Sequence, residues 1–114
     1  MIKKAEFTHK VLGAPYKVKI GDKDFTEIRE ENMGECQVYA KKILVSTEVE
    51  DCNEKELEVR TKEIIAHELL HAYLNEAGVD LESEVEERLA SFFMKNHEKL
   101  SKSISDICGS LDIK

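Results

Sequence analysis

The chain has 114 residues, of which 41% are apolar and 36% are charged, and its formal net charge at pH 7 is −7. This length supplies one hydrophobic core, so we expect a single domain over residues 1–114. The composition is that of a folded globule rather than a disordered or fibrous chain. The negative charge removes the electrostatic attraction on which sequence-independent nucleic-acid binding and docking on anionic membranes rely. We therefore expect neither a nucleic acid nor a membrane as partner.

The cysteine content and the N-terminal segment indicate the compartment. Charged residues interrupt the apolar stretch that a signal peptide needs after its basic start, so no targeting segment is predicted. The chain has three cysteines, an odd number at wide spacing, which favours free thiols in a reducing compartment over a disulfide framework. The sequence therefore predicts a cytoplasmic protein.

Residues 16–20 alternate between apolar and basic side chains, which is typical of a strand with one buried face. Gly21 and Asp22 are turn residues, and we expect residues 25–28 to form the returning strand of a first hairpin.

Two further β-prone runs, residues 36–39 and 43–45, predict a second hairpin. Its outer strand is expected at an edge of the sheet. The strands therefore fall within residues 16–46 and predict a small, mostly antiparallel sheet.

The second half of the chain has helical periodicity. Asn53 followed by Glu56 is typical of a capping box, and apolar residues then recur at helical spacing over residues 53–77. A second apolar stripe predicts a helix over residues 82–100, and residues 104–108 favour a short additional helix. The chain therefore predicts an α+β fold with two long helices after the sheet.

Residues 67–71 read His67-Glu68-Leu69-Leu70-His71, the HExxH pattern. Residues four apart lie on the same face of a helix, so both imidazoles can bind one zinc ion. Glu68 lies about 100° around the helix from His67, beside the metal, where it can act as general base toward a zinc-activated water. In the alternative reading the two histidines are ordinary surface or core residues, but the motif's place within the most periodic helix favours a metal site.

A catalytic zinc needs a third protein ligand, and the second helix begins with four candidates: Glu82, Glu84, Glu86 and Glu87. Periodicity favours Glu86, because it lies on the same side of the helix as Leu89 and Phe93. The competing explanation is that this acidic run is a solvated helix face.

The runs His67 to Gly78 and Glu87 to Ser91 resemble the gluzincin metallopeptidases, in particular short phage and prophage proteins related to the ImmA/IrrE family. In that family the third ligand is a glutamate that is followed three residues later by a small residue and then by Asn or Asp. The resemblance, which covers roughly residues 34–95, therefore implies Glu87 as ligand with Ala90 as the small residue. Ser91 departs from the family's amide or carboxylate, and Glu86 stays as the alternative ligand.

The resemblance implies a zincin-like fold and hydrolysis of peptide bonds in a peptide or protein substrate that is bound along the sheet edge. Tyr39, Tyr73 and His97 are candidate donors to the oxyanion of that reaction. Two other functions remain open. One is a zinc-binding protein without catalysis, and the other is a protein-interaction module of phage or mobile-element origin. The substrate and the oligomeric state are not determined by the sequence.

Overall fold

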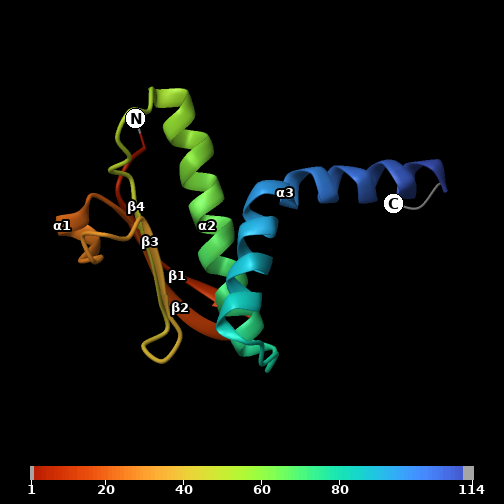
Figure 1. Ribbon diagram of the computed structural model, residues 1–114, viewed down its shortest axis with the longest axis horizontal. Helices are drawn as coiled ribbons and strands as arrows, with labels where there is room; N and C mark the ends of the chain where they lie inside the picture. The colour runs from red at the N-terminus through yellow and green to blue at the C-terminus, as the bar shows by residue number, and fades with distance from the viewer. Residues whose placement is uncertain (1, 112–114) are drawn as a thin grey trace.

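A small sheet, a long helix and a second long helix lie side by side in that order in the computed structural model, which describes residues 2–111 (Figure 1). The elements in chain order are β1 (Ala5–Val11), β2 (Ala14–Gly21), α1 (Lys23–Thr26), β3 (Gly34–Gln37), β4 (Lys42–Ser46), α2 (Glu54–Glu76) and α3 (Ser83–Ser110). The fold is therefore α+β. No helix in the described part of the chain is long and apolar enough to cross a bilayer.

The four strands have the spatial order β1-β2-β4-β3. β1 pairs with β2 and β3 pairs with β4 in antiparallel fashion, whereas the central strands β2 and β4 are parallel, with Val18 opposite Ile43. Two of the three pairings are antiparallel, as expected, but the parallel pairing of β2 with β4 makes the sheet mixed. The physical reason is that the chain crosses over after β2 through α1, so the second hairpin joins the sheet through its later strand.

The alternating run in β2 is a strand as predicted, with Tyr16 and Val18 buried and Lys17 exposed between them. Its hairpin partner is β1, which the sequence analysis did not predict. Apolar Ala5, Phe7 and Val11 alternate with polar residues in β1, but His9 breaks the pattern, and only Val11 is buried. Its two-residue turn, Leu12-Gly13, has positive φ at both positions, 49° and 87°, without the Asn or Asp that usually marks such turns.

The prediction of a returning strand at residues 25–28 is wrong. Phe25 lies in the single-turn helix α1, and Ile28 follows it as a buried loop residue. Asp22 explains the difference, because its side chain accepts a hydrogen bond of 2.7 Å from the Phe25 backbone N–H and caps that helix. A residue that we interpreted as part of a strand turn is therefore a helix cap.

The second hairpin is present, with the first strand two residues earlier than predicted, and its outer strand β3 is an edge of the sheet as expected. α2 packs against β3 and β4. The core between the sheet and α2 is formed by Val11, Tyr16, Val18, Ile43, Val45, Ile64 and Ala72.

The helix predicted over residues 53–77 is α2, and the side chain of Asn53 accepts a hydrogen bond of 2.8 Å from the Glu56 N–H at its start. α3 runs back along α2, as Figure 1 shows, but its predicted end at residue 100 is wrong. The helix continues to Ser110 and includes residues 104–108, because no helix-breaking residue interrupts the run before Gly109. This last part turns away from α2 and leaves four apolar side chains more than half exposed: Leu100, Ile104, Ile107 and Leu111.

The C-terminal end of α2 is tied to the sheet by a polar cluster. The hydroxyl of Tyr16, a fully buried residue, donates a hydrogen bond of 2.6 Å to Glu76, and Lys41 forms an ion pair with the same carboxylate. The hydrogen bond from Lys41 and then that from Tyr16 hold the pKa of Glu76 below its ordinary value. This cluster fixes the orientation of α2 at the end that leads into α3.

We predict that Glu76→Gln makes the protein's stability less sensitive to acid. A carboxyl whose pKa is lowered by folding stabilises the fold above its ordinary pKa of 4.5, and this stabilisation is lost as the pH falls through the folded value. Chemical denaturation at neutral and acidic pH measures the effect. Glu58→Gln, an exposed carboxyl change on the same helix, is the control. Equal acid sensitivity in both variants and the parent would contradict the prediction.

Candidate metal centre

The two histidines of the HExxH pattern lie one turn apart on the face of α2 that meets α3. Their ring centroids are 5.0 Å apart, and their side chains are only 15% and 13% exposed for His67 and His71. α3 reaches them because Ala90, which is fully buried, lets the two helices approach closely. The first turns of α3 therefore bring carboxylates to the histidine pair.

One carboxylate, that of Glu87, faces the Nε2 atoms of both histidines. Its Oε2 lies 3.3 Å from Nε2 of His67, and its Oε1 lies 2.8 Å from Nε2 of His71. One nitrogen from each histidine and one oxygen of Glu87 lie within 4.8 Å of one another. Donors at the corners of a zinc tetrahedron are about 3.4 Å apart, so this set of two imidazoles and one carboxylate fits a zinc ion.

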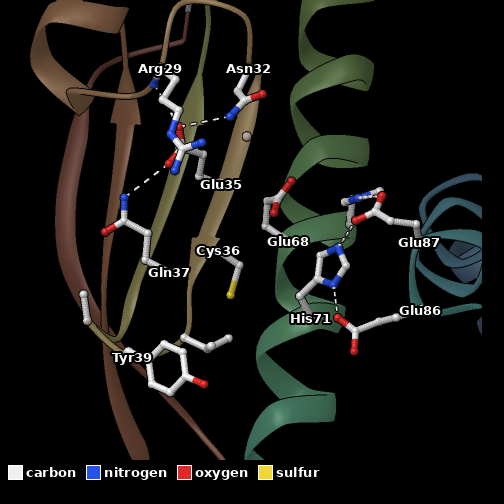
Figure 2. A pocket seen from close by; sticks show the side chains of 14 residues that line it. Arg29, Asn32, Glu35, Cys36, Gln37, Tyr39, Glu68, His71, Glu86 and Glu87 are labelled. Atoms are coloured by element: carbon white, nitrogen blue, oxygen red, sulfur yellow. Dashed lines mark hydrogen bonds and ion pairs between the residues drawn. The ribbon is translucent and has the colours of Figure 1, made fainter. Parts of the chain in front are cut away.

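Glu86 lies on the opposite side of the His71 ring, where its carboxylate is 2.5 Å from Nδ1 (Figure 2). Both candidate glutamates thus lie at the site, but they contact different nitrogens of His71. Glu86 contacts Nδ1, and Glu87 contacts Nε2. The other two candidates are exposed, and Glu84 pairs with Arg88 at 3.0 Å. Two of the four glutamates, Glu86 and Glu87, therefore contact the histidines, whereas the other two are exposed to solvent.

Glu68 is buried in the wall of the same cleft, with an exposed fraction of 8%. Burial raises its pKa to about 7, the charges of Glu87 and Glu35 act in the same direction, and the charge of His71 acts against them. A carboxyl with this pKa can accept and release a proton near neutral pH. This is the property that a general base needs.

The imidazole of His67 has its pKa lowered, first by burial, although the Glu87 charge opposes the shift. The neutral imidazole is the form that binds metal, so the environment favours the ligand state. Its other nitrogen, Nδ1, is buried and has no hydrogen-bond partner among the described residues.

A cleft of about 750 Å³ separates this cluster from β3 and the loop before it. Figure 2 shows Glu68, His71, Glu86 and Glu87 on one wall, and it shows on the other wall the side chains of Arg29, Asn32, Glu35, Cys36, Gln37 and Tyr39. Glu35 organises the second wall by accepting hydrogen bonds from the Arg29 backbone at 2.8 Å and from Asn32 and Gln37 at 3.2 Å each. Burial acts to raise the pKa of Glu35, but these three hydrogen bonds lower it below its ordinary value.

Gly34, whose role was not predicted from the sequence, controls how closely the two walls of the cleft approach. A Cβ atom at this position would lie 2.6 Å from Ile64 Cγ2 and 2.8 Å from Glu68 Oε2. A side chain at this position would therefore displace Ile64 and Glu68 or push β3 away from α2. A glycine two residues before the predicted strand was the available signal, since glycine in strands often marks a close approach of another element.

Of the candidate oxyanion donors, only Tyr39 lines the cleft, and its side chain is fully exposed there. His97 instead contacts Phe93, with the ring centroids 5.5 Å apart, and Tyr73 lies outside the cleft lining. Cys36 also lines the cleft, but burial and the nearby charge of Glu68 raise its pKa to about 12. Its thiol therefore stays protonated and is a poor nucleophile.

Comparisons of this chain with protein-family models, with curated proteins and with solved structures found no match.

We predict that Gly34→Ala destabilises the protein by about 1–3 kcal/mol, because the added methyl group overlaps Ile64 and Glu68. Thermal or chemical unfolding measures this loss. Gly109→Ala is the matched control, since a Cβ there meets no atom within 4 Å and alanine favours a helix. If both variants were as stable as the parent, the close approach at Gly34 would not constrain the fold.

We predict that the metal-free protein loses stability as the pH rises from about 5 to 8. The folded state keeps the Glu68 proton up to its pKa of about 7, whereas the unfolded chain releases it near 4.5. Ionisation in the fold therefore costs up to about 3 kcal/mol above pH 7. Glu68→Gln cannot ionise, so it should match the parent near pH 5 and exceed it near pH 8 in denaturation experiments with a chelator. Parallel pH profiles of the two proteins would refute this.

Proposed function

We propose that this protein is a zinc-dependent metallopeptidase with a zincin-like fold, which hydrolyses peptide bonds with Glu68 as general base. The observation that carries the proposal is the meeting of two imidazole Nε2 atoms and the Glu87 carboxylate at one point, beside a buried carboxyl in an open cleft. The resemblance of the HExxH and glutamate segments to gluzincins of the ImmA/IrrE type supports the same reading.

The donor set suits one zinc ion, held by His67, His71 and Glu87. When bound, zinc supplies a Lewis acid that polarises a carbonyl and lowers the pKa of a water molecule. Three donor residues meet at this point, and no fourth joins them among residues 2–111. This count is typical of catalytic sites, which keep one position for water or substrate.

The chain's own residues account for the proton transfers. Glu68 faces the cleft beside the donor cluster, where its carboxylate can take a proton from the attacking water and pass it to the leaving amine. β3 forms the facing wall and an edge of the sheet, so an extended peptide can pair with its backbone. The walls thus bring substrate and base together in one cleft.

Zinc content and turnover of purified variants test the proposal. We expect about one zinc per chain in the parent and in Glu84→Ala, and loss of zinc in His67→Ala and Glu87→Ala. Glu68→Gln should keep its zinc but lose at least about 100-fold in the rate of cleaving a mixture of unstructured peptides, because the base is absent. Mass spectrometry of the peptides measures cleavage, and elemental analysis measures zinc.

The other outcomes separate the alternative functions. A parent that binds zinc but cleaves no peptide, with Glu68→Gln unchanged in every assay, would indicate a zinc-binding protein without catalysis. A parent that binds no zinc under metal-replete conditions would overturn the proposal in favour of a protein-interaction module.

A further inference from the structure

One histidine of the cluster has a carboxylate on each ring nitrogen, and the other has not. His71 contacts Glu87 through Nε2 at 2.8 Å and Glu86 through Nδ1 at 2.5 Å. The Nδ1 atom of His67 has no such partner in the part of the chain that the structure describes. Because the two histidines are neighbours on one helix, this difference comes from α3, which places Glu86 beside only one of the rings.

Glu86 is well suited to fix that ring. It lies between helix α2 and solvent with its side chain 28% exposed, so the hydrogen bond is partly shielded from water. Within residues 2–111, Ser91 is exposed and forms no hydrogen bond with either histidine. Among the described residues, Glu86 is therefore the acceptor that can set the orientation of a ligand histidine.

We propose that Glu86 is a positioning residue, which accepts the Nδ1 proton of His71 and thereby directs the Nε2 lone pair of His71 at the metal position. The inference rests on the proposed zinc site and assigns adjacent glutamates two different roles. Glu87 binds the metal directly, whereas Glu86 acts only through His71. A carboxylate in this place selects the tautomer, restricts rotation of the ring and makes the imidazole a stronger ligand.

Competition with a chromophoric chelator tests the inference by measuring the zinc dissociation constant of each variant. We expect Glu86→Ala to raise this constant by about 10- to 100-fold. Glu86→Gln should raise it much less, because the amide oxygen still accepts the Nδ1 proton. Glu84→Ala removes the same charge two residues away on the same helix, so a change below about threefold is expected. Glu86→Met serves as a second acceptor-free variant if the alanine variant folds poorly.

NMR of the zinc-loaded proteins supplies a second readout that does not depend on activity. The parent and Glu86→Gln should show a slowly exchanging, downfield Nδ1 proton of His71, and Glu86→Ala should lose it. A retained proton signal in Glu86→Ala, or equal zinc affinity in Glu86→Ala and Glu84→Ala, would overturn the positioning role. Equal losses in Glu86→Ala and Glu86→Gln would also overturn it, because charge alone would then explain the effect.

The same titration separates the two proposals. If the parent binds one zinc ion that His67→Ala abolishes, and Glu86→Ala binds it equally well, then only the role of Glu86 fails. If the parent itself binds no zinc, the proposed function fails and the role of Glu86 fails with it.

Discussion

The contact between β3 and α2 at Gly34 is the constraint on which the candidate site depends. Because this glycine has no side chain, the strand can approach the helix until it covers the Glu68 carboxyl. That cover removes water from Glu68 and so raises its pKa toward neutrality. The same approach makes β3 the far wall of the cleft. One backbone position thus influences both the proton affinity of Glu68 and the shape of the space in front of it.

A second close approach, between α2 and α3, provides the rest of the site. Ala90 is fully buried at this crossing, and Glu86 and Glu87 precede it by about one turn. Two adjacent residues on a helix point about 100° apart, so from this distance they straddle an imidazole ring rather than meet the same atom. The small residue at the crossing therefore explains why neighbouring glutamates reach different nitrogens of His71.

The parts of this arrangement that depend on local spacing could be predicted from the sequence. The pairing of His67 with His71 follows from helical geometry, and the capping of α2 at Asn53 follows from side-chain chemistry. The distinction between Glu86 and Glu87 did not follow, because periodicity favoured one residue and family resemblance the other. Strand β1, the end of α3 and the role of Gly34 were missed or misjudged for different physical reasons. Most side chains of β1 are exposed, so the strand lacks a buried face. The helix α3 continues because no helix-breaking residue precedes Gly109. Gly34 matters because α2 places Ile64 and Glu68 directly opposite it, which the sequence near Gly34 does not reveal.

The carboxylates around the cleft show how such non-local contacts differentiate identical groups. Glu35 accepts three hydrogen bonds, which keep its pKa low despite partial burial. Glu68 has a raised pKa because it is buried without comparable donors. Glu86 and Glu87 each face a nitrogen of His71 instead. A solvated acidic surface would leave all four groups with similar environments. Their separation into a stable anion, a proton acceptor and two histidine partners is the pattern that acid–base chemistry at a cation requires, and it supports reading this cleft as a site.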